Sequence, residues 1–306
     1  MFHKWIKTCA FSSLLLSLFS NTVYAQVEVF ACEPEWASLV RTLGGDRVRV
    51  YSATTAQQDP HHIQARPSLI AKVRRAELLV CTGAELETGW LPLLLRKSGN
   101  GKIQQNQQGY FMAAAHVSLL DKPAVLDRSL GDIHAAGNPH FHLDPYRMMQ
   151  IADALCANLQ KIDPENSSFY QQNLSKFNDD WKYAISQWEK QAQSLKDKKI
   201  VVSHDSWIYL EQWLGLTKVA VLEPKPGSPP SSGHLSHVLS LLKHNPADII
   251  LYADYQSDKS AQWLSQRTKI STIGLPFSPS SDENLIQWFD RFFKQLLSTE
   301  LLSTEL

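Results

Sequence analysis

The sequence predicts an α/β protein of two lobes, each with a mostly parallel sheet flanked by helices, joined by one long rigid helix beside a cleft. Three observations lead to this fold class. The chain has 306 residues, about two domains' worth. Short apolar runs alternate with amphipathic segments in both halves, a pattern typical of βαβ units and parallel sheets. A stretch without Gly or Pro, residues 166–196, separates the two halves.

Residues 1–25 are interpreted as a secretory signal peptide. Basic residues near the start precede an apolar run, residues 10–19, that is too short to span a membrane, and residues 23–25 loosely fit a small-x-small cleavage site. A buried N-terminal helix is the alternative, but residues 27–31 already have the character of a first strand. Cys9 lies too early for lipid attachment. We therefore expect a soluble exported protein, and the leader favours a Gram-negative periplasm.

The composition excludes several classes of protein. Hydrophobic residues make up 43% and charged residues 20%, which excludes a disordered chain. Basic and acidic residues both number 30, and removing the leader with Lys4 and Lys7 leaves 28 basic against 30 acidic. A nucleic-acid binder needs a basic surface, so no nucleic-acid partner is expected. No run after the leader is long and apolar enough to cross a bilayer.

We place the N-terminal lobe at residues 26–165. Its strands are short apolar runs, and its helices carry apolar residues at helical spacing. Gly44 and Gly45 follow one such periodic segment, which is a signal for a helix C-terminus. In chain order we expect strand Val27–Ala31, helix Pro34–Leu43, strand Val48–Ser52, helix Ser68–Arg75, strand Leu78–Cys81 and helix Pro145–Leu159.

The linking helix is predicted over residues 166–196. A single unbroken helix of this length would measure roughly 46 Å at 1.5 Å per residue. Such a helix is stiff and leaves the lobes little hinge freedom. Its apolar stripe, at steps of three or four, consists of Tyr170, Leu174, Phe177, Trp181, Ile185, Trp188, Ala192 and Leu195.

We place the C-terminal lobe at residues 197–306, where the same alternation of runs returns. The segment LLSTE occurs twice, at 296–300 and 301–305, and is interpreted as the frayed end of a helix. In chain order we expect strand Ile200–Ser203, helix Ser206–Leu214, strand Lys218–Val221, helix Gly233–Lys243, strand Ile249–Tyr252, helix Asp258–Thr268, strand Ile270–Ile273 and helix Asp282–Leu297.

Three cysteines remain after cleavage of the leader. Cys32 and Cys81 each end a predicted strand, so a disulfide is geometrically possible if those strands are neighbours. The alternative is three buried thiols, Cys156 included. Both readings stay open, and the spacing matches no zinc site built from cysteines.

Three histidines lie at predicted ends of strands or helices. His204 directly follows strand 200–203, His61 lies in the loop after strand 48–52, and His140 precedes a helix. His61 and His140 each follow a proline, which restricts the local backbone. Ligands of open α/β sheets bind beyond the carboxyl ends of the strands. Neutral imidazole is a good donor to Zn²⁺ at about 2.0–2.1 Å, so three such donors can make most of a tetrahedral site.

The chain resembles the periplasmic zinc/manganese substrate-binding proteins of ABC importers, the cluster A-I group. The resemblance covers nearly the whole mature chain, and it implies that His61, His140 and His204 bind a metal ion between the lobes. It also implies a non-catalytic carrier that delivers its ion to a permease of the inner membrane. The protein is expected to be a monomer, with a metallochaperone as a further candidate partner. The matching stretches are DPHHIQARPS, AELLVCTGAELE, NPHFHLDP, SHDSWIYLEQWLGL and EPKPGSPPSSGHL.

Within this resemblance, His204 indicates zinc as the transported ligand. Manganese members commonly carry a carboxylate there, and Mn²⁺ prefers oxygen ligands whereas imidazole suits Zn²⁺. Manganese or another divalent ion remains the alternative. The family often adds an Asp from the loop after the last strand, which implies Asp282, the first acidic residue of GLPFSPSSDEN. Asp254 or water is the alternative fourth ligand.

The neighbouring histidines leave some assignments open. His62 and His142 lie within two residues of His61 and His140, and either could be the ligand instead. We prefer the two that follow proline, as in the family pattern. Many zinc members also carry a long His-rich loop before the second ligand, but here that segment has only His134, so no capture role is expected for it.

A zinc hydrolase is the alternative from another class of function. Three histidines and an open position can activate water. Such an enzyme also needs a general base, and Asp205 is the one obvious candidate. The chain has neither the HExxH spacing nor a GxSxG turn. We therefore expect no catalytic residues.

Overall fold

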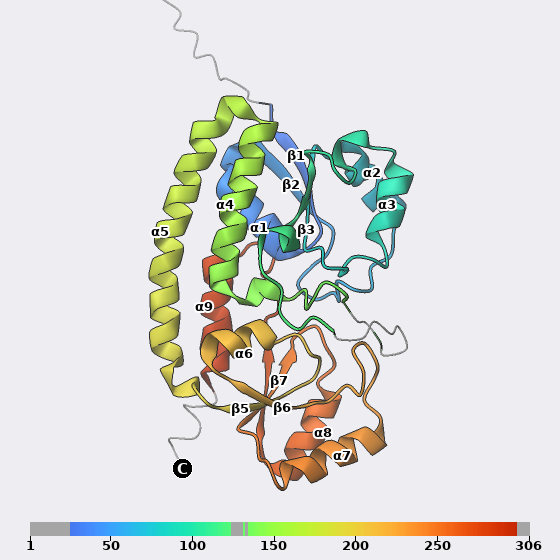
Figure 1. The fold of residues 1–306 in the computed structure, drawn as a ribbon, viewed down its shortest axis with the longest axis vertical. Helices are drawn as coiled ribbons and strands as arrows, with labels where there is room; N and C mark the ends of the chain where they lie inside the picture. Colours follow the sequence, from blue (N-terminus) through green and yellow to red (C-terminus); the bar gives the residue numbers. More distant parts are fainter. Residues whose placement is uncertain (1–24, 124–130, 132–133, 299–306) are drawn as a thin grey trace, which may run out of the picture.

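The computed structural model describes residues 25–123, 131 and 134–298. The predicted leader, apart from Ala25, and most of the repeated LLSTE segment lie outside these residues. Figure 1 shows two α/β halves stacked one above the other, with a long helix running beside both. No helix among the described residues is long and apolar enough to cross a bilayer.

The first half contains a parallel sheet in the order β2-β1-β3-β4. The predicted strands and helices are confirmed to within three residues at each end. Strand β4 and helix α3 were not predicted; β4 has only three residues, too few to show a period. The elements are β1 Val27–Ala31, α1 Pro34–Gly44, β2 Val48–Ser52, α2 Pro67–Arg75, β3 Leu78–Cys81, α3 Leu91–Ser98 and β4 Tyr110–Met112.

The second half repeats this topology, with a parallel sheet in the order β6-β5-β7-β8. The two-sheet α/β fold class is therefore confirmed. All strands are parallel, so the carboxyl ends of each sheet share one edge. The elements are β5 Lys199–Val202, α6 Ile208–Leu214, β6 Thr217–Val221, α7 Ser232–Leu242, β7 Ile249–Ala253, α8 Lys259–Thr268, β8 Ser271–Leu275 and α9 Leu285–Leu296.

Two antiparallel helices connect the halves. Helix α4 (Pro145–Ile162) begins where the side chain of Asp144 accepts hydrogen bonds from two backbone N–H groups, which caps the helix. Helix α5 (Ser167–Gln191) continues into a short 3-10 turn, Ala192–Leu195, so the linking helix is somewhat shorter than predicted. In Figure 1, α5 runs beside α4 in the upper half and reaches the lower sheet.

Helix α9 packs against α5, so the last described helix lies beside the linking helix (Figure 1). The Phe289 ring lies 5.2 Å from Trp181 and 4.8 Å from Trp188, measured between ring centroids. Aromatic pairs at this separation each add about 0.5–1.5 kcal/mol beyond their area burial. One continuous buried core therefore includes strands and helices of both halves.

Cys32 and Cys81 form a disulfide, with their Cα atoms 4.8 Å apart, and Cys156 is a buried free thiol. The pairing is possible because β1 and β3 are neighbours in the sheet. Of the two alternatives, a Cys32–Cys81 disulfide or three buried thiols, the structure therefore has the disulfide. The bond fastens the strand ends that lead into the loops of the first half.

Reduction of this disulfide should destabilise the protein. Opening a loop of 49 residues costs about 4 kcal/mol in the chain-entropy account. We expect dithiothreitol to lower the midpoint of denaturant unfolding of the wild-type chain. A Cys32→Ala/Cys81→Ala variant should unfold at a midpoint that the reductant does not change. An equal shift in both proteins would show that the loop closure is not the cause.

Candidate metal centre

Three histidines from different parts of the chain meet between the two sheets. Each of His61, His140 and His204 offers one ring nitrogen, and these atoms all lie within 4.8 Å of one another. Their ring centroids are 5.5 to 5.9 Å apart. The first sheet supplies the loop with His61, the second supplies His204 directly after β5, and His140 precedes α4. The predicted convergence of the three imidazoles is therefore present in the structure.

His61 is oriented by the acidic residue two positions before it. Asp59 Oδ1 accepts hydrogen bonds from the His61 backbone N–H at 2.9 Å and from Nδ1 at 2.8 Å. A carboxylate only accepts, so Nδ1 carries the proton and the lone pair of Nε2 is directed elsewhere. Burial raises the pKa of Asp59, but its bonds to His61 outweigh this and hold the pKa below its usual value.

His204 is oriented by Glu223, which follows β6. Glu223 Oε2 accepts hydrogen bonds from His204 Nδ1 at 2.7 Å and from the Gly227 backbone N–H at 2.9 Å. Burial lowers the pKa of His204, but the hydrogen bond and charge of Glu223 outweigh it, so this pKa lies above its usual value. A carboxylate behind an imidazole is the arrangement that fixes and strengthens metal-binding histidines.

His140 is the buried centre of the cluster. It is 1% exposed, and neither of its ring nitrogens has a hydrogen-bond partner. Burial, and then the neighbouring histidines, lower its pKa well below the usual value, so the ring is neutral. Its backbone N–H donates to Asn138 Oδ1 at 3.1 Å, which holds the turn before α4. A buried nitrogen with an unused lone pair fits a metal ligand, because a bound ion would satisfy it.

The two acidic residues considered as a fourth ligand lie outside this cluster. Asp282 is exposed and accepts a hydrogen bond from Ser281 Oγ at 2.9 Å. Asp254 accepts hydrogen bonds from Gln57 Nε2 at 3.3 Å and from the Phe277 backbone N–H at 3.4 Å. In the loop after β8, Phe277 is the residue that contacts the His140 ring, at 5.3 Å between centroids.

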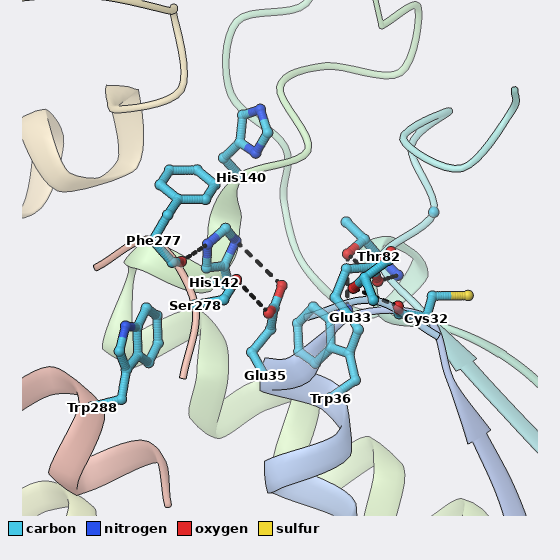
Figure 2. Close-up of polar contacts among 12 residues, drawn as sticks. Cys32, Glu33, Glu35, Trp36, Thr82, His140, His142, Phe277, Ser278 and Trp288 are labelled. Carbon is cyan, nitrogen blue, oxygen red and sulfur yellow. Dashed lines mark hydrogen bonds and ion pairs between the residues drawn. The ribbon is translucent and has the colours of Figure 1, made fainter. Parts of the chain in front are cut away.

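His62 and His142, the alternative ligands, also lie outside the cluster. His62 is exposed, with its ring 6.2 Å from the His61 ring. His142 is buried, and its Nε2 donates to the Phe277 carbonyl at 3.1 Å, as Figure 2 shows. Burial lowers the pKa of His142 to about 4. The neutral His142 ring therefore joins the start of α4 to the loop after β8.

Buried carboxyl groups, Glu33 and Glu35 among them, lie below His140 in Figure 2. Glu35 Oε1 is 3.9 Å from His142 Nδ1, and its Oε2 accepts a hydrogen bond from Ser278 Oγ at 3.0 Å. Glu33 accepts hydrogen bonds from the backbone and side chain of Thr82. Burial raises the pKa of Glu33 well above its usual value and the pKa values of Glu35 and Glu87 to about 7.

Sequence reasoning missed three residues that contact the cluster. Asp59 and Glu223 orient His61 and His204, and His134 places its Nε2 3.3 Å from His61 Nε2. Asp59 lies two residues before His61, a spacing typical of a local turn, and this signal was available. Glu223 and His134 are distant in sequence from their partners and gave no local signal.

Comparisons with known proteins identify the class. The sequence profile of the family described as "Zinc-uptake complex component A periplasmic" matches residues 29–298. The chain is 21% identical over 264 residues to the manganese ABC transporter substrate-binding lipoprotein PsaA of Streptococcus mitis, covering 84% of this chain and 82% of that protein. It is 22% identical over 218 residues to the high-affinity zinc uptake system protein ZnuA of Bacillus subtilis, covering 70% and 66%.

Solved structures share the fold. A crystal structure of ZnuA superposes with a TM-score of 0.72 at 22% identity, covering 88% of this chain and 96% of that one. The Zn(II)-bound AdcA of Streptococcus pneumoniae gives 0.69 at 22% identity, covering 88% and 56%. The fold and the site together define a metal-binding component of an ABC importer, which is not an enzyme and acts outside the cytoplasm. The chain belongs to the ZnuA family, and its transported ligand is a divalent metal ion.

The raised pKa of Glu87 predicts a pH-dependent effect of replacing it. Its pKa is about 7 in the folded protein against an ordinary 4.5, so the folded state binds more protons between these values. Stability is therefore lost as the pH rises from about 4.5 to 7. The glutamine of Glu87→Gln cannot ionise. The free energy of unfolding of this variant, relative to that of wild type, should therefore increase by about 1–3 kcal/mol from pH 5 to pH 8.

Denaturant unfolding of both proteins at pH 5 and pH 8 checks this expectation. The exposed Glu165→Gln is the matched control and should show no such gain. An identical stability difference for Glu87→Gln at both pH values would contradict the account of a neutral buried carboxyl.

Proposed function

We propose that this protein is the periplasmic zinc-binding component of its importer. His61 and His204 bind Zn²⁺ through Nε2, and His140 binds through one of its ring nitrogens. The observation that carries the proposal is the convergence of the three buried imidazoles around His140, whose ring nitrogens have no other partner.

The donor set favours zinc over manganese. The three converging atoms are all imidazole nitrogens, which suit Zn²⁺ better than Mn²⁺. The carboxylates of Asp59 and Glu223 are hydrogen-bonded to the far side of the rings, so they offset the ion's charge without binding it. The similar proteins include both manganese and zinc binders by name, so the preference rests on the chemistry of these residues.

The site is suited to holding an ion rather than to activating water. Asp205, the candidate general base, forms an ion pair with Lys218. A base engaged in this way is poorly placed to accept a proton from bound water. We propose that the ion passes unchanged to a permease of the inner membrane, that the carrier acts as a monomer, and that a metallochaperone is a further candidate partner. Residues 1–25 would direct the chain to the periplasm.

Replacing His140 tests the proposal. His140→Ala should weaken Zn²⁺ binding by at least about tenfold to a hundredfold, since even residues that only orient a ligand have effects of this size. Chelator competition measures the Kd for Zn²⁺ and for Mn²⁺, and wild type should bind zinc more tightly. His62→Ala, a change of the exposed neighbour, is the matched control and should leave the Kd near wild type. Unchanged zinc binding by His140→Ala would refute the site.

Proton competition gives a second test. A histidine must lose its proton to bind metal, and the hydrogen bond and charge of Glu223 raise the pKa of His204, so this ligand takes up a proton at a higher pH than an ordinary histidine. The Kd for Zn²⁺ should therefore rise steeply below roughly pH 6.5. Glu223→Gln removes the charge that raises this pKa, so the rise should move to lower pH. A Kd that is constant from pH 7.5 to 5.5 would exclude histidine ligation.

A further inference from the structure

His61 differs from the other two histidines of the cluster in how the chain holds it. It lies in the loop of residues 53–66, between β2 and α2, which contains neither a helix nor a strand. His140, by contrast, directly precedes a 3-10 turn that leads into α4, and His204 lies two residues after β5. A metal ligand has to be held within about 0.5 Å of its working position, so the His61 loop needs support from outside itself.

Trp90, at the start of α3, supplies this support. Its Nε1–H donates a hydrogen bond to the Pro60 carbonyl at 2.9 Å, and the bond is buried. That carbonyl belongs to the peptide group that joins Pro60 to His61. Proline has no backbone N–H, so the carbonyl is its one hydrogen-bonding group. The indole therefore fixes the peptide plane from which the His61 backbone continues.

Trp90 is itself firmly held. Its side chain is 1% exposed and packs in a buried apolar cluster with residues of β1, β3, α2 and α3. Its backbone N–H donates to the Glu87 carbonyl at 3.1 Å. The carboxyl group of Glu87 in turn accepts a hydrogen bond from the Gly83 backbone N–H at 3.1 Å, two residues after β3. A chain of hydrogen bonds therefore runs from the end of β3 through Trp90 to the His61 loop.

The backbone next to Trp90 contacts His61 as well. A Cβ atom at Gly89 would lie 3.2 Å from the His61 carbonyl oxygen, closer than ordinary van der Waals contact. Residues 89 and 90 therefore touch the carbonyl groups of both Pro60 and His61. Asp59 sets the rotation of the His61 ring, whereas residues 89 and 90 set the position of its backbone.

We propose that Trp90 is the residue that positions His61 for metal binding. This inference rests on the proposed function of the same site. The indole N–H holds the His61 loop where the ring nitrogen of His61 lies within 4.8 Å of those of His140 and His204. Without this hydrogen bond the loop loses an attachment to the first half of the protein. Zinc binding then has to order the loop as well, and this cost weakens the affinity.

Replacement of Trp90 by phenylalanine tests the proposal, because Phe keeps an aromatic ring and lacks the N–H donor. Trp90→Phe should raise the Kd for Zn²⁺ by roughly tenfold, as loss of a partner outside the ligands typically does. Chelator competition measures this Kd. Trp181→Phe is the matched control and should keep the wild-type Kd, since Trp181 is buried and its Nε1 donates to the Pro145 carbonyl at the same 2.9 Å, between α5 and α4.

A double-mutant cycle shows whether Trp90 acts through His61. In a His61→Ala background, Trp90→Phe should change the Kd by less than about twofold, because the ligand that it positions is gone. A weakening as large as in the wild-type background would show a general loosening of the fold and would overturn the proposal.

Gly89→Ala provides a second variant if thermal melts show that Trp90→Phe does not fold. Its added Cβ would displace the His61 carbonyl without removing a hydrogen bond, so the Kd should rise. Gly101→Ala, where an added Cβ has nothing within 4 Å, is the control and should match wild type. In that case a wild-type Kd for Gly89→Ala would overturn the positioning of His61 from this segment.

The outcomes separate the two proposals. A wild-type Kd in folded Trp90→Phe, with zinc binding lost in His140→Ala, would overturn the role of Trp90 and leave the three-histidine site intact. If wild type binds no zinc, or if His140→Ala binds it as wild type does, the proposed function itself fails.

Discussion

The metal centre depends on one buried, neutral imidazole, that of His140, whose two ring nitrogens have no hydrogen-bond partner. A buried polar atom left unpaired costs about 1–3 kcal/mol of folding free energy. The unpaired ring of His140 is therefore tolerated only because other parts of the protein stabilise the folded state. This stabilisation comes from the large buried core that spans both halves of the protein. Binding of a cation would satisfy the unused lone pair, so the same feature that costs stability drives ion capture.

The cluster lies where parallel sheets place their ligands, at the carboxyl edges of two sheets that face each other. Its ligands come from both halves, so the relative position of the halves sets the ligand geometry. That position is fixed by bonds across the boundary. His142 donates to the Phe277 carbonyl, Ser278 Oγ donates to Glu35 Oε2 at 3.0 Å, and Gln57 donates to Asp254. The core that joins the sheets around α5 and α9 adds to this rigidity, so ion release requires local opening or help from the partner.

The strands and the three central histidines were predictable because their signals are local. The strands at 27–31, 48–52 and 78–81 are apolar runs bounded by turns, and their bounds match β1, β2 and β3. The sequence did not indicate that Asp282 lies outside the histidine cluster. It comes two residues before Asn284, which caps α9, and Phe277 of the same loop contacts the His140 ring. The contact between His134 and His61 was not predictable, because His134 is held by the Ala84 carbonyl, from a residue 50 positions away in the sequence.

The most direct test is a crystal structure of the zinc-loaded protein with anomalous data collected at the zinc edge. The account predicts one strong anomalous peak between the sheets, about 2.0–2.1 Å from ring nitrogens of His61, His140 and His204. Zinc-loaded crystals with no peak there, or with the peak at other residues and these three rings unchanged, would contradict it.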